Sequence, residues 1–206
     1  MSQPAEIFQQ HYQNYLARIS GIDLASVQET LGLVKKNDQY LIPFFGRNYA
    51  VSKNGIMDDT GKVPDYATCV ILAKYLIMCP DRIHEDTQWA AFKDFKRTSH
   101  VLNVNYFSSD TEKVLVTAFK GRHDALAAAG TAVGGIFPDE DISYDLVMQF
   151  AALPRISLLL LFNEGDEDFG AYGTVLFQKQ AEYYLDPESL AVTSAHLARR
   201  LVQAAI

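Results

Sequence analysis

The spacing of apolar residues changes several times along the first third of the chain. Residues 4–20 carry aromatic and aliphatic side chains at helical spacing, and Gly21 ends that pattern. Residues 23–31 predict a second short helix that ends at Gly32. Residues 40–45 and 48–52 then read as two strands joined at a tight turn, with Pro43 placing the first strand at a sheet edge or a bulge. Asn54–Gly55 predicts a further hairpin.

The middle of the chain contains the most apolar helical segment. Residues 66–79 are almost free of polar side chains, which predicts a helix buried on nearly all sides, opened by Pro64–Asp65 and ended by Pro80. A short helical turn is expected at 89–95 and a strand at 101–107. Ser109 and Glu112 have the spacing of a capping box, which predicts the start of a long helix that runs past Leu126.

The last third predicts strands followed by a final helix. Residues 143–150 and 156–162 are predicted to form strands, and the second is continuously apolar, as a strand covered on both faces would be. Residues 174–178 pair back as a hairpin partner, and Asp186 with Pro187 caps the last helix. Because strands are grouped instead of alternating with helices, we expect an α+β fold. A mostly antiparallel or mixed sheet would pack against about five helices in a single domain, residues 1–206.

Composition and charge limit the classes of partner. Hydrophobic residues make up 49% of the 206 residues and charged residues 21%, which is enough for a core without disulfides. The net charge of −7 disfavours binding to nucleic acid. No apolar run reaches the length of a membrane span, and no signal peptide is seen, so we expect a cytoplasmic protein that does not insert into membranes. Cys69 and Cys79 are expected to be buried thiols.

The familiar catalytic signatures are incomplete in this chain. Gly55 and Gly61–Lys62 resemble a phosphate-binding loop, but the glycine spacing is too long and Val63 stands where Ser or Thr is needed. The acidic turn at 139–150 lacks the glycine and the glutamate of a calcium loop. The five histidines lack zinc spacing. The sequence therefore names no cofactor and does not decide whether the protein is an enzyme.

The acidic loop, residues 163–168, is the most informative candidate site. Glu164, Asp166, Glu167 and Asp168 crowd together directly after the apolar strand, and their mutual repulsion favours a neutralising cation. Arg155 and Arg47 are candidate partners of these carboxylates, as is a metal held by Glu164, Asp166 and Asp168, with His123 as a candidate base. An ordinary solvated hairpin loop is the alternative.

One segment carries a family resemblance. Ala152-Leu-Pro-Arg-Ile-Ser-Leu-Leu-Leu-Leu-Phe-Asn-Glu-Gly-Asp-Glu-Asp-Phe169, followed by 175–177 and 181–186, resembles the family named domain of unknown function 3786, and residues 42–52 are similar to a strand pair in its N-terminal half. The resemblance implies a bacterial or archaeal protein, common in anaerobes, with no established activity. Some relatives accompany iron–sulfur modules, but this chain has no cysteine cluster, and Asn163 stands where the family leads us to expect a tryptophan.

Three functions follow as hypotheses. The first is an accessory module that binds a small molecule or a partner protein at the acidic loop, with Arg47 and Arg155 nearby. The second is a divalent-metal-dependent enzyme that uses the loop carboxylates. The third is a structural domain that forms a homo-oligomer, in which the loop only keeps a sheet edge soluble.

Overall fold

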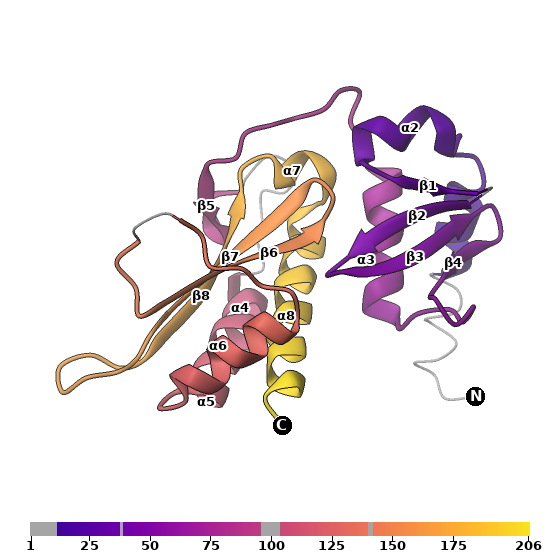
Figure 1. Ribbon diagram of the computed structural model, residues 1–206. Helices are drawn as coiled ribbons and strands as arrows, with labels where there is room; N and C mark the ends of the chain where they lie inside the picture. The colour runs from indigo at the N-terminus through magenta and orange to yellow at the C-terminus, as the bar shows by residue number, and fades with distance from the viewer. Residues whose placement is uncertain (1–11, 38, 96–103, 140–141) are drawn as a thin grey trace.

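The computed structural model describes residues 12–37, 39–95, 104–139 and 142–206. Figure 1 shows two sheets, with α2 and α3 beside the first and α4 to α8 beside the second. The first sheet has the order β1-β2-β3-β4, with β1 Val34–Lys36, β2 Gln39–Phe44, β3 Arg47–Ser52 and β4 Gly55–Met57. Every pairing in it is antiparallel.

The helices of the amino-terminal half begin and end close to the residues that the sequence predicts, and capping residues fix their ends. Residues 12–19 are helical, within the first predicted helix; its residues before 12 lie outside the described part. Helix α2 (Leu24–Leu31) begins after Asp23, whose carboxylate accepts from a backbone N–H, and ends at Gly32 in the left-handed region with φ 67°. Helix α3 (Tyr66–Ile77) begins after Asp65 and is largely buried.

The β2–β3 hairpin is confirmed, and it carries a strained turn. Phe45 and Gly46 have φ values of 45° and 76°, as a two-residue hairpin requires. Left-handed backbone is uncommon for phenylalanine, but the Phe45 N–H donates to the Ala152 carbonyl, 2.9 Å away, which fixes the turn against the second sheet. Pro43 lies in an inner strand, not an edge strand. Its neighbour β1 pairs only with residues 39–41, so Pro43 needs no second hydrogen-bonding partner.

The second sheet has the order β5-β8-β7-β6 and is also antiparallel. Its strands are β5 (Trp89–Ala91), β6 (Leu146–Leu153), β7 (Ile156–Asn163) and β8 (Tyr172–Gln178). Strand β7 is the apolar strand of the sequence pattern, and it lies between two partners with most of its side chains buried. Residues 89–95, predicted as a helical turn, instead form β5 followed by the short 3-10 helix η1 (Phe92–Asp94).

The helices of the second half differ most from prediction. Residues 104–107, expected in a strand, form helix α4 (Val104–Phe107), while 101–103 lie outside the described residues. Helix α4 continues through the π-helical segment η2 (Ser108–Glu112) into α5 (Lys113–Phe119), so the Ser109–Glu112 capping box is wrong. The long helix breaks at Gly121, whose φ is 70°, and resumes as α6 (His123–Ala132). Helices α7 (Ala181–Tyr184) and α8 (Pro187–Ala204) follow.

The two sheets share one hydrophobic core. A single cluster of buried residues includes Ile42 and Val51 of the first sheet and Leu158 and Phe177 of the second. Helices α3 and α8 pack against each other, and β2 also contacts β6. The α+β class and the antiparallel pairing are therefore confirmed, although the strands form two sheets instead of one. No helix in the described ranges has the length and apolar character needed to cross a bilayer.

Candidate functional site

A cationic cavity of about 440 Å³ lies where β3 and the start of α3 meet α8. Strand β3 contributes Arg47 and Tyr49, which point the same way because side chains two positions apart share one face of a strand. Helix α8 contributes residues 196, 199, 200 and 203, whose spacing places them on one helical face. The complete lining is Arg47, Tyr49, Asp65, His196, Arg199, Arg200 and Gln203, here called the arginine cavity.

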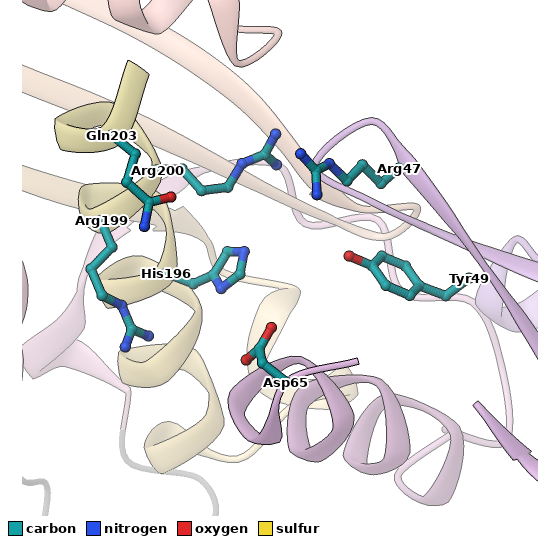
Figure 2. A pocket seen from close by; sticks show the side chains of 7 residues that line it. All are labelled: Arg47, Tyr49, Asp65, His196, Arg199, Arg200 and Gln203. Carbon is teal, nitrogen blue, oxygen red and sulfur yellow. The ribbon is translucent and has the colours of Figure 1, made fainter. Parts of the chain in front are cut away.

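Two guanidinium groups face each other across this cavity. Figure 2 shows Arg200 of α8 and Arg47 of β3 directed toward one another, with His196 below them. Ion pairs to a carboxylate are absent for all three arginine side chains of the cavity within the described residues. Positive charge is therefore concentrated here with no acidic side chain paired to it, in a chain whose net charge is −7.

Arg200 is held in place by backbone and aromatic contacts. Its Nη1 donates to the Phe45 carbonyl oxygen at 2.8 Å, and its guanidinium carbon lies 5.6 Å from the centre of the Phe45 ring. Burial lowers the pKa of Arg200, and the nearby charge of Arg47 lowers it further. Both effects mean that the folded protein bears a cost for keeping this cation charged, which a bound anion would reduce.

His196 is packed as an aromatic ring with access to the cavity. Its ring is nearly parallel to that of Phe45, with centroids 5.6 Å apart, and lies 5.0 Å from that of Phe44. Burial lowers the pKa of His196 to about 4; Asp65 opposes the shift, while Arg200, Arg199 and Arg47 add to it. The imidazole is thus neutral near neutral pH. Its nitrogen atoms have no hydrogen-bond partner in the described part of the chain.

Asp65 and Tyr49 complete the polar wall. The Asp65 carboxylate accepts from the Thr68 backbone N–H at 3.1 Å and from the Thr68 hydroxyl at 2.7 Å. Burial alone would raise the pKa of Asp65, but these hydrogen bonds outweigh it and hold the pKa below its usual value. Burial raises the pKa of Tyr49, which therefore keeps its proton and can donate it to a ligand.

The acidic loop lies at the other end of the second sheet, beside a hollow of about 800 Å³. Backbone N–H groups donate hydrogen bonds to two of its carboxylates. Glu164 Oε2 accepts from Gly121 at 2.8 Å, and Asp166 Oδ1 accepts from Asp168 at 2.9 Å and from Phe169 at 2.6 Å. These backbone amides offset part of the negative charge of Glu164 and Asp166, for which the sequence predicted a neutralising cation. Asp168 itself is exposed. No group of three or more metal-ligating side chains occurs among the residues that the structure describes.

The remaining predicted site residues lie in three different places. Arg155 donates to the carbonyls of Thr30 and Glu29 at the end of α2. It is separated from the acidic loop by the eight residues of β7, or about 25 Å. Arg47 lies in the arginine cavity. His123 is brought near the loop region, with its Nε2 3.1 Å from the Asp145 carbonyl oxygen, and this hydrogen bond raises the pKa of His123.

Most of the arginine cavity was missed by sequence reasoning. In the sequence, Arg199 and Arg200 stand out only as basic residues late in the predicted last helix, where they suit the helix dipole. A usable signal was present: His196 and Gln203 continue the same polar stripe at helical spacing, beside the apolar stripe of the helix. A polar stripe on a helix is most often solvated. It indicates a binding site here only because Arg47 and Tyr49 of β3 line the same cavity.

Comparison with known proteins places the chain in a family but gives no activity. No curated protein and no solved structure matches it. Residues 23–200 match the family described as Domain of unknown function (DUF3786), which covers both sheets and helix α8 up to Arg200. The match includes most of the lining of the arginine cavity. The chain therefore belongs to the DUF3786 family.

Proposed function

We propose that the protein binds a small anionic molecule in the arginine cavity. One observation carries this proposal: three guanidinium groups line a cavity of about 440 Å³, and none of them forms an ion pair with a carboxylate among the described residues. Guanidinium groups bind carboxylates and phosphates through paired hydrogen bonds, so both ligand classes suit the site.

Partial burial separates Arg200 from ordinary surface cations, whereas Arg47 and Arg199 are exposed. A guanidinium in open water gains little from an ion pair, because water already solvates it. Arg200 instead packs on Phe45 and is partly removed from water, and Arg47 faces it. An anion placed between them would relieve the repulsion of the two like charges and form hydrogen bonds in a setting of reduced solvation.

Calorimetric titration with inorganic phosphate and with citrate tests the proposal. We expect saturable binding by the wild type and at least tenfold weaker binding by Arg200→Gln and by Arg47→Gln. Arg18→Gln is the matched control, since Arg18 is exposed and outside the cavity lining, and it should bind like the wild type. Equal affinity in all four proteins, or no binding by the wild type, would refute an anion site here.

The three functions predicted from the sequence remain predictions, and thermal melts distinguish them from the proposal. A ligand that binds only the folded state raises the melting temperature by mass action. Stabilisation by Mn²⁺ or Mg²⁺ that is lost in Glu164→Gln would favour a metal-dependent enzyme at the acidic loop. Stabilisation by anions that is lost in Arg200→Gln favours the arginine cavity. A concentration-dependent melt that responds to neither would favour a structural, homo-oligomeric domain.

A further inference from the structure

The charge balance of the arginine cavity limits the kind of anion that it can neutralise. Arg47, Arg199 and Arg200 supply three positive charges, and Asp65 supplies one negative charge. The net charge of the lining itself is thus 3 − 1, or two positive charges, with His196 neutral near neutral pH; Asp58 and Asp59 line an adjoining hollow beyond Arg47 and Tyr49. A monoanion would leave one of these charges uncompensated, whereas a dianion would balance them. Tetrahedral dianions also present several acceptor oxygens, which can meet donors on different walls of the cavity.

His196 stands at the centre of this set of charges. Figure 2 shows the Tyr49 hydroxyl and the Asp65 carboxylate directed toward it, with Arg200 and Arg199 on its two sides. The aromatic rings of Phe44 and Phe45 pack on it from the β2–β3 hairpin. The charged or titratable groups that act on the imidazole come from three elements: Arg47 and Tyr49 of β3, Asp65 before α3, and Arg199 and Arg200 of α8.

Resting on the proposed function, we propose that the cavity selects a doubly charged oxyanion of the phosphate-monoester or sulfate type, and that His196 takes up one proton when this anion binds. Protonation gives the imidazole a second N–H donor, in place of its acceptor nitrogen. The anion in turn compensates the arginine charges that oppose protonation. The two events therefore favour each other, as linked binding equilibria must.

The sign and size of the linkage follow from the position of His196. In the empty cavity burial and the arginine side chains hold its pKa at about 4, against an ordinary value of about 6.5. If the dianion restored the ordinary value, affinity would rise about 30-fold between about pH 8 and about pH 5; a restoration half as large would give a rise of about 2.5-fold. The affinity must increase as the pH falls, because the bound form holds the extra proton.

Sulfate is the probe that isolates this effect, because it stays doubly charged between about pH 8 and about pH 5. Methyl sulfate has the same tetrahedral shape with one charge fewer. We expect sulfate to bind at least tenfold more tightly than methyl sulfate at equal ionic strength, and to bind at least twofold more tightly at about pH 5 than at about pH 8. Titrations in buffers of different ionisation enthalpy should show net proton uptake on sulfate binding near pH 5.

Variants assign the proton to its residue. In His196→Gln the dependence of sulfate affinity on pH should disappear, whereas His123→Gln, which removes a histidine outside the cavity, should retain it. Circular dichroism at both pH values checks that each variant is folded. Phenyl phosphate, compared with sulfate, tests whether the cavity also accepts an ester.

The outcomes separate this inference from the proposed function. Sulfate binding that needs Arg200 but does not change with pH, or methyl sulfate binding as tightly as sulfate, would overturn the inference and leave anion binding intact. A pH dependence that survives in His196→Gln would overturn the role of His196. Absence of any anion binding by the wild type would overturn both.

Discussion

The half-buried imidazole of His196 should make the stability of the protein depend on pH in a way that one substitution removes. Its pKa in the folded state is about 4, below the ordinary value of about 6.5 that it regains on unfolding. Between those two values the unfolded chain binds a proton that the folded protein does not. His196 therefore favours the unfolded state increasingly as the pH falls from about 6.5 toward 4, and has no such effect above about 7.

The size of this effect follows from the difference between the two pKa values. At about pH 5 the free energy of unfolding should be about 2 kcal/mol lower, through His196 alone, than at about pH 7.5. A glutamine at this position is polar, similar in length and does not titrate. The His196→Gln protein should therefore lose about 2 kcal/mol less than the wild type over the same interval, whatever its absolute stability.

Urea unfolding followed by circular dichroism at about pH 7.5 and about pH 5 measures this difference. The buffers must exclude phosphate, sulfate and citrate, because an anion in the cavity would raise the pKa of His196 and reduce the effect. His123→Gln is the control with the opposite sign. Because the pKa of His123 is raised in the folded state, His123 stabilises the fold at low pH, and this stabilisation is lost as the pH rises. Equal losses in the wild type and in His196→Gln would show that the imidazole is not held neutral by its surroundings.

Three further predictions concern other parts of the fold. Gly32→Ala should lower the free energy of unfolding by about 1–3 kcal/mol, because φ is 67° there and the new Cβ would lie 2.8 Å from that of Pro154; urea unfolding measures it, and no loss would contradict it. Arg155→Met should cost about 1–3 kcal/mol through the lost hydrogen bonds to the end of α2, again by urea unfolding, yet leave phosphate titrations unchanged; weaker phosphate binding would place Arg155 in a site. A thiol reagent at about pH 8 should modify half-buried Cys79 well before Cys69, whose pKa burial raises to about 12; equal rates would argue against this packing.

Features set by neighbouring residues were predictable from the sequence. Asp23, Asp65 and Asp186 were recognised at helix starts, because a capping side chain bonds to backbone only two or three residues away. The β2–β3 hairpin is predicted because a glycine separates two apolar runs, but its turn residues are Phe45 and Gly46, so the predicted first strand extends one residue too far. Strand β7 was recognised by its unbroken apolar run.

Features that depend on competing local signals were predicted poorly. Apolar and polar residues alternate weakly over residues 101–107, which predicts a strand, yet residues 104–107 form a helix that packs on α8. The Ser109–Glu112 pair has the spacing of a cap, but Glu112 instead accepts a hydrogen bond from the Thr174 hydroxyl at 2.7 Å, across to β8. In both places contacts distant in sequence outweigh local preference, which is worth only a few tenths of a kcal/mol per residue.

By itself the sequence determined the α+β class, the helix caps, the hairpins and the dry central strand, because periodicity and capping act over a few residues. Only the tertiary structure decided that the face of α8 with His196, Arg199 and Arg200 meets Arg47, and that carboxylates of the acidic loop accept hydrogen bonds from backbone amides instead of pairing with an arginine. The reason is physical: Arg47 and Arg200 lie far apart in the chain, and the packing of α3 on α8 and of β2 on β6 brings them together. No local pattern encodes that packing.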